Sequence, residues 1–161
     1  TNAKKISETL YINRLETVYK LMMISFLVFF IPIILFGEQL VLLLYGTEYT
    51  VAASLFVLAA FRTLFTNYGV ARGLFITNEN LFKYSMYFTI VGSIINICLN
   101  IILIPIYQST GALIATFISF TITIFIVNLF FDRFKENGKI MIKTLFNFYT
   151  IKIKDIKWFY F

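Results

Sequence analysis

The residue with the clearest chemical potential is Arg62, an arginine that lies near the middle of the apolar stretch 51–75. Counted from Val51, it lies about 16 Å along a helix, close to the centre of a bilayer core. An arginine at that depth costs about 2.5–3.5 kcal/mol on insertion scales, so it should face a partner or a watery cavity. Thr66 and Gly69 follow at spacings of 4 and 3, and therefore share its helix face.

The planar guanidinium of an arginine binds carboxylates and phosphates through paired hydrogen bonds. Every Asp and Glu of the sequence lies outside the stretches that we expect to span a membrane. The counter-charge of Arg62 is therefore either an acid elsewhere in the protein or an anionic ligand. The first alternative makes Arg62 half of a structural ion pair, and the second makes Arg62 and Thr66 a candidate substrate-binding site. The residues alone leave both open.

Other site chemistries find few residues to carry them. The sequence has no histidine, and its one cysteine, Cys98, lies inside an apolar stretch. This removes His-based metal sites, Ser-His or Cys-His nucleophile pairs and any disulfide framework. Paired carboxylates for acid–base catalysis are also missing. The sequence therefore predicts a protein that is not an enzyme and that needs no metal or cofactor.

The elements that hold Arg62 are predicted from composition. The chain is 60% hydrophobic and 14% charged, with a mean hydropathy of +0.84, whereas soluble domains are about 25% charged. No charged residue occurs in 88–131, where Pro105 and Gly111 frame the only break. This length predicts a transmembrane helical hairpin, since membrane crossings must satisfy their own backbone hydrogen bonds. The fold class is an all-α polytopic transmembrane bundle with four spans, at about 18–36, 51–75, 84–105 and 111–131.

Charge divides the chain into a lead-in helix at 1–20, the bundle at 21–131 and a basic aromatic tail at 132–161. Lys and Arg number four in the lead-in, two in the loop after the second span and seven in the tail, and the other loops have none. This positive-inside pattern predicts that both ends are cytoplasmic. The net charge of +6 thus indicates contact with anionic membrane lipids at the tail, not with nucleic acid. The end of the tail, IKIKDIKWFYF, alternates like a strand, but we expect it to lie at the membrane surface.

Several residues are predicted to have structural roles. Pro32 lies inside the first span, and Gly46 is expected to end a short interfacial helix made by LVLLLY. Gly92, Asn96 and Asn100 belong to a ridge of small and polar residues on the third span. Such ridges let membrane helices approach closely, so we expect the two asparagines to hydrogen-bond to a neighbouring helix.

Three motifs in order, LLYGTEY (43–49), GSIINICLNIILIP (92–105) and GALIATFISF (111–120), carry a family resemblance. Over about residues 15–131 the chain resembles the C-terminal part of bacterial polysaccharide-transporter flippases. These are the O-antigen (Wzx-type) members of the multidrug/oligosaccharidyl-lipid/polysaccharide exporter superfamily. Two positions depart from the family pattern: Gln108 stands where a glycine usually follows Ile-Pro, and Leu113 replaces a small residue.

The resemblance implies a protein of about twelve spans in two lobes, of which this chain is a C-terminal fragment with the last four. The implied activity moves an undecaprenyl-pyrophosphate-linked oligosaccharide repeat unit across the bacterial inner membrane, for O-antigen of lipopolysaccharide or another surface polysaccharide. One lobe would rock against the other around a central cavity. Its pyrophosphate or an acidic sugar would then be the ligand of Arg62, and the remaining spans would be its structural partners.

Two alternatives to this function remain. One is a drug or lipid-precursor exporter of the same superfamily, which an intramembrane acid for cation coupling would favour. The other is a self-contained four-helix membrane protein, either a carrier or an assembly subunit.

Overall fold

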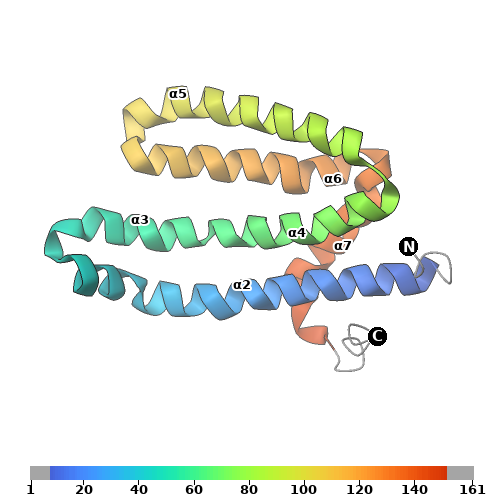
Figure 1. The fold of residues 1–161 in the computed structure, drawn as a ribbon, viewed down its shortest axis with the longest axis horizontal. Helices are drawn as coiled ribbons and strands as arrows, with labels where there is room; N and C mark the ends of the chain where they lie inside the picture. Colours follow the sequence, from blue (N-terminus) through green and yellow to red (C-terminus); the bar gives the residue numbers. More distant parts are fainter. Residues whose placement is uncertain (1–7, 152–161) are drawn as a thin grey trace.

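The computed structural model describes residues 8–151, and every element in that range is helical. Figure 1 shows long helices packed side by side, with one helix crossing them at one end. The long helices run antiparallel in chain order, so the predicted all-α class is confirmed for the described part of the chain. In order the elements are α2 (Glu8–Tyr45), η1 (Thr47–Tyr49), α3 (Thr50–Ala60), α4 (Arg62–Glu79), α5 (Phe82–Phe120), η2 (Thr121–Ile126), α6 (Val127–Phe130), η3 (Asp132–Phe134), α7 (Lys135–Asn147) and η4 (Phe148–Thr150).

Three helical stretches are long and apolar enough to cross a membrane: Glu8–Tyr45, Thr47–Glu79 and Phe82–Phe130. Only 6%, 22% and 17% of their most apolar windows lie buried inside the fold. Their apolar side chains therefore face outward, as lipid-facing or partner-facing surfaces do. A membrane-compatible helical protein is thus what the structure supports.

The third stretch folds back on itself. Its 49 residues would reach about 73 Å as one straight helix, far beyond a bilayer core of about 30 Å. At Gln108 the backbone leaves the helical region, with φ 51° and ψ −131°, and Figure 1 shows the chain reversing direction there. Positive φ favours glycine, so glutamine is an uncommon residue at such a position. The predicted hairpin is confirmed as a pair of packed helices.

The first predicted span is part of a longer helix. We expected a span at 18–36 followed by a separate interfacial helix, but α2 is one helix from Glu8 to Tyr45. Gly37 lies inside this helix and does not interrupt it. Its missing side chain lets α3 approach closely. A Cβ there would lie 3.3 Å from both Phe56 and Val57. Gly46, with φ 93°, ends the helix as predicted.

The second predicted span is two helices rather than one. Between α3 and α4 the amide of Phe61 bonds to the Leu58 carbonyl at 3.2 Å, and that of Leu64 bonds to the Phe61 carbonyl at 3.1 Å. These short i→i−3 bonds tighten the turn and make Arg62 the first residue of α4. Helix α4 then continues to Glu79 and is capped by Asn80. Asn80 has a left-handed backbone with φ 57°, which asparagine tolerates.

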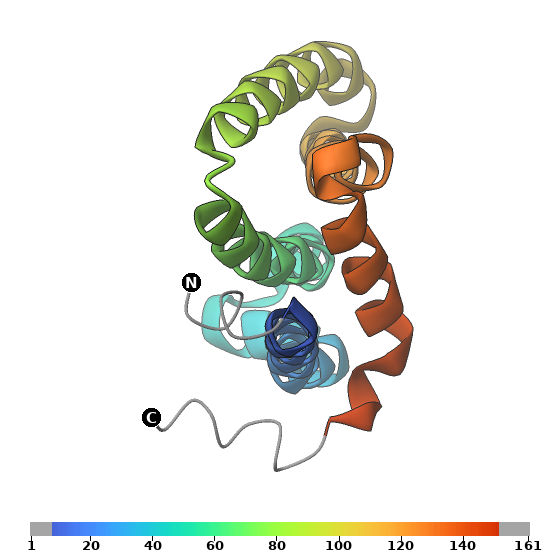
Figure 2. The same cartoon turned by 90° about the vertical axis from the view of Figure 1, so that its right-hand side faces the viewer.

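Helix α7 runs crosswise along one side of the bundle, as Figure 2 shows. It contacts α2, α4 and α6, and so connects the α5 hairpin to the first two stretches. The predicted basic tail at 132–161 thus begins with a packed helix. The strand-like segment IKIKDIKWFYF lies beyond the described residues except for Ile151.

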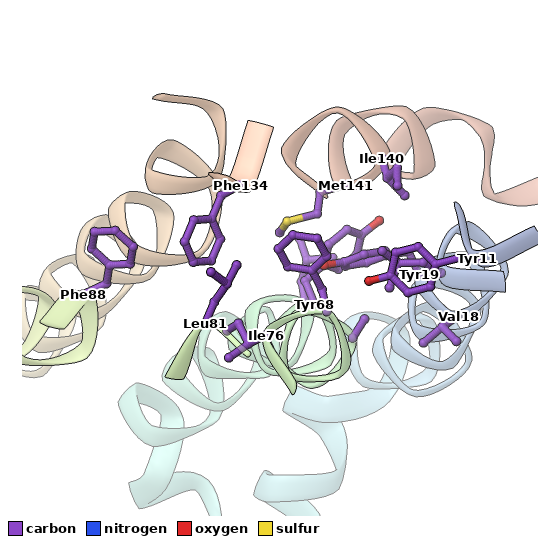
Figure 3. Packing of buried hydrophobic residues seen from close by; sticks show 14 of the residues in the cluster. Tyr11, Val18, Tyr19, Tyr68, Ile76, Leu81, Phe88, Phe134, Ile140 and Met141 are labelled. Atoms are coloured by element: carbon purple, nitrogen blue, oxygen red, sulfur yellow. The ribbon is translucent and has the colours of Figure 1, made fainter. Parts of the chain in front are cut away.

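The hydrophobic core is concentrated at the end of the bundle that α7 crosses. In Figure 3, rings and aliphatic side chains from α2, α4, α5, η3 and α7 converge there, and Tyr19, Tyr68, Phe134 and Met141 are completely buried. At the opposite end, large apolar side chains such as Leu43 are exposed. The bundle is therefore held together mainly at one end.

Buried hydrogen bonds hold α7 in this core. The Tyr19 hydroxyl donates to Asn137 Oδ1, and Asn137 Nδ2 donates to Asn128 Oδ1, both at 2.9 Å. The hydroxyls of Tyr68 and Thr144 lie 3.3 Å apart. All five side chains are completely buried. Each side chain has a partner, as a buried polar group requires, so the network fixes the position of α7 on α2 and α4.

An ion cluster adds to this contact at the surface. Glu16 of α2 binds Lys20 at 2.8 Å and Lys143 of α7 at 2.7 Å. Burial of the carboxyl raises the pKa of Glu16, but the hydrogen bonds from the two lysines outweigh burial and hold the pKa below its usual 4.5. The carboxylate is thus charged at neutral pH and links the two helices.

Candidate functional site

A cavity of about 550 Å³ lies between α4 and the two arms of the α5 hairpin. Helix α4 supplies two arginines to it, Arg62 and Arg72, with Gly69 between them. Residues 62, 69 and 72 are spaced i, i+7 and i+10, so they lie along one stripe of the helix. The two arginines are about 15 Å apart along the axis, and both face the same cavity.

The hairpin forms the facing wall with small and polar residues. The first arm, before Gln108, contributes Thr89, Gly92, Ser93 and Asn96. The second arm, which follows Gln108 and continues into η2, contributes Thr116, Ser119 and Thr123. The arms touch where Gly92 faces the side chain of Thr123, because a Cβ at Gly92 would collide with its methyl group. The ridges predicted from spacing therefore pack together and also line the cavity.

The hydroxyl groups of this wall are acceptors toward the cavity. Thr89 Oγ1 donates to the Ser85 carbonyl at 2.9 Å, and Ser93 and Thr116 make the same bond to the residue four positions earlier. Ser119 and Thr123 do likewise. Such bonds use the single hydroxyl proton and leave oxygen lone pairs free. The cavity thus has guanidinium donors on its α4 wall, and its hairpin wall has hydroxyl acceptors together with the side-chain amide of Asn96.

Arg62 begins α4 at the break in the second stretch. Its side chain is exposed, and its guanidinium makes no hydrogen bond or ion pair with any of residues 8–151. The first turn of a helix adds unpaired N–H groups and the positive end of the dipole. Thr66 does not line the cavity; its exposed hydroxyl points back to the Arg62 carbonyl at 3.4 Å. Of the two predicted binding residues, Arg62 therefore lines the cavity and Thr66 does not.

Arg72 is a cavity residue that the sequence reasoning missed. We counted it as a cytoplasmic loop cation, but it lies inside α4 and is only 8% exposed. Its Nε and Nη2 atoms are buried without a hydrogen-bond partner among the described residues. The guanidinium carbon lies 5.5 Å from the centre of the Phe134 ring. The i, i+7, i+10 stripe that begins at Arg62 was the signal that could have found it.

The predicted packing residues have varied environments. A Cβ at Gly111 would collide with the Leu103 carbonyl, so this glycine permits close approach of the hairpin arms. Around Gly46 nothing lies within 4 Å, so its positive φ, not packing, requires glycine. Pro32 and Pro105 lie inside α2 and α5 on exposed positions.

The expected hydrogen bond from the asparagines of the third span to a neighbouring helix is absent from the described structure. Asn100 Nδ2 instead donates to Asn96 Oδ1 at 2.9 Å, one turn away on the same helix. Asn96 reaches the cavity, and Asn100 does not line it. The helical spacing that put both residues on one face also put them within reach of each other.

Within residues 8–151 no group of His, Cys, Asp or Glu side chains could hold a metal ion. The cavity chemistry therefore rests on the two guanidinium groups and the hydroxyl wall. Comparisons with known protein families, with curated proteins and with solved structures found no match to this chain.

Proposed function

We propose that this chain is part of a bacterial inner-membrane flippase that moves a lipid-linked oligosaccharide between leaflets. The substrate class is an undecaprenyl-pyrophosphate-linked repeat unit for O-antigen or another surface polysaccharide, as the resemblance to Wzx-type flippases implies. The observation that carries the proposal is the cavity with arginine donors on one wall and hydroxyl acceptors on the other. Arginine forks suit phosphate oxygens, and acceptor oxygens suit the hydroxyl groups of a sugar.

In this proposal the chain crosses the membrane four times. Helix α2 makes one crossing, α3 with α4 another, and the two arms of the α5 hairpin the last two. The charged end with α7 faces the cytoplasm, because eight of the described Lys and Arg residues lie toward it: Arg14, Lys20, Arg72, Lys83, Arg133, Lys135, Lys139 and Lys143.

The remaining spans of a larger two-lobed transporter would cover the outward apolar faces and close the cavity. A helix interrupted at a binding residue is a recurrent feature of transporters that work by alternating access. The break before Arg62 fits that pattern, since it places the proposed binding residue at the start of a helix.

The test uses the complete gene product in cells that depend on it for surface polysaccharide. Arg62→Ala should abolish surface polysaccharide at normal protein levels, and Arg62→Lys, which keeps the charge but loses the fork, should stay partly active. Lys139→Ala, an exposed cation on α7, is the matched control and should remain fully active. Normal accumulation of Arg62→Ala with full surface polysaccharide would refute the role of this cavity.

A further inference from the structure

We propose that Arg72 is a second anion-binding residue of the cavity, which binds the diphosphate headgroup of a lipid at the α7 end, separately from Arg62. This inference rests on the proposed function and deepens it, because it places two binding positions along one helix. The first reason is the state of the Arg72 side chain. It is 92% buried in a cavity wall, and two of its nitrogen atoms have no partner among residues 8–151.

A buried guanidinium is costly unless an anion compensates its charge. Two of the acids at this end bind lysines: Glu16 binds Lys20 and Lys143, and Asp132 binds Lys135 at 2.6 Å. Arg72 forms no ion pair with any described residue. The missing counter-charge therefore points to a ligand that enters the cavity.

The aromatic surroundings hold Arg72 in a state suited to binding. Its guanidinium carbon lies over the Phe134 ring, and Phe134 is completely buried against Phe88, with 5.6 Å between ring centres. A cation–π contact engages the face of the guanidinium and leaves the N–H donors at its edge, of which Nε and Nη2 are reached by an anion only when the side chains that shield them move aside. Those donors match the paired oxygens of a phosphate group.

The register of α4 and α5 orders the two positions. The helices are joined by the short turn Asn80–Leu81, so residues at similar distances from it face each other across the cavity. Arg72 and Thr89 lie eight residues from the turn on either side. Arg62 lies about 15 Å further along α4, roughly one bilayer leaflet, and Asn96 lies about 10 Å further along α5. A headgroup that enters at the α7 end would meet Arg72 before Arg62.

The experiment measures binding of inorganic pyrophosphate to the purified complete protein in detergent, by calorimetry and by the shift in melting temperature. Arg72→Met should weaken pyrophosphate binding at least tenfold, and Arg72→Lys should weaken it less. Lys139→Met is the control and should bind like the wild type. Unchanged affinity of Arg72→Met would overturn the proposal.

A stability measurement separates binding from a structural role. Without ligand, Arg72→Met should melt no lower than the wild type, because it removes a buried charge that has no ion-pair partner among residues 8–151. A lower melting temperature together with rescue by Arg72→Lys would show a structural ion pair and would overturn the proposal. A polyisoprenyl diphosphate in nanodiscs should displace pyrophosphate while the matching polyisoprenol does not, and failure to displace would refute the lipid as source. If Arg72→Met loses pyrophosphate binding while cells that lack the whole protein keep their surface polysaccharide, the Arg72 site stands and the proposed transport function fails.

Discussion

Substitution of Asn137 in α7 should lower the free energy of unfolding of the bundle strongly, although it changes few atoms. It is completely buried, accepts from the Tyr19 hydroxyl and donates to Asn128 Oδ1, each at 2.9 Å. It also donates to Met141 Sδ at 3.4 Å. Asn137→Leu keeps the size and shape of the side chain while removing all three interactions. The change therefore tests the network rather than the packing.

The expected cost follows from what the substitution leaves behind. The Tyr19 hydroxyl and Asn128 Oδ1 become buried groups without that partner, and each such group costs about 1–3 kcal/mol. Removing a buried amide from the core returns about 1–2 kcal/mol of desolvation. We expect Asn137→Leu to lower the free energy of unfolding by about 2–4 kcal/mol.

The assay is equilibrium unfolding of the complete protein in mixed micelles, with hydrogen exchange of the α7 amides as a local readout. Adding Tyr19→Phe to Asn137→Leu removes one orphaned group, so the two changes together should cost at least about 1 kcal/mol less than their sum. Asn147→Leu, the same change at the end of α7, removes no side-chain hydrogen bond of the described structure and should cost under about 0.5 kcal/mol. An Asn137→Leu protein as stable as the Asn147→Leu control would refute the network as the attachment of α7.

Three further predictions follow from packing, charge and orientation. Gly92→Leu should destabilise the protein by about 1–3 kcal/mol through overpacking of the hairpin, whereas Gly73→Leu, with no atom within 4 Å of its added Cβ, should be near neutral in the same unfolding assay. Because the pKa of Glu16 is lowered in the fold, its contribution is fully present above pH 4.5 and is lost as the pH falls through the folded pKa; Glu16→Gln should remove this part of the acid dependence of unfolding. In cells, a cysteine at Thr47 should react with an impermeant thiol reagent from outside and one at Asn80 should not, with the native cysteine replaced; the reverse labelling would contradict the proposed orientation.

Hydropathy and charge predicted the helical class and the hairpin, and the glycine at position 46 predicted the end of a helix. Each of these features depends on a local property of the sequence. The reversal at Gln108 shows the limit of this reasoning. A glutamine rarely adopts positive φ, and nothing in its type indicates the turn; only the position relative to Pro105 and Gly111 does. This strained backbone conformation of Gln108 occurs at the turn between the two apolar arms that pack together.

The position of α7 could not be predicted from the same pattern. Its buried face carries Asn137, Gly138 and Thr144, residues that sequence patterns assign to solvent. Gly138 is required because a Cβ there would collide with the Asn128 carbonyl. The polar side chains of Asn137 and Thr144 can be buried because they form hydrogen bonds with residues of other helices. The sequence of α7 alone does not reveal these partners. Arg72 was misassigned for the same reason: its charge suggested a loop, and its neighbours bury it.

The attachment of α7 also sets an order of events during synthesis. Tyr19 and Asn137 are separated by 118 residues, so the ribosome completes α2 long before the partner of its buried hydroxyl exists. Until α7 emerges, the inner side of the first helices carries polar groups with no place in lipid. The nascent bundle therefore depends on its last described helix to become a finished protein. A chaperone or insertase that shields α2 and α4 during this interval would protect them from degradation and from premature pairing with other chains.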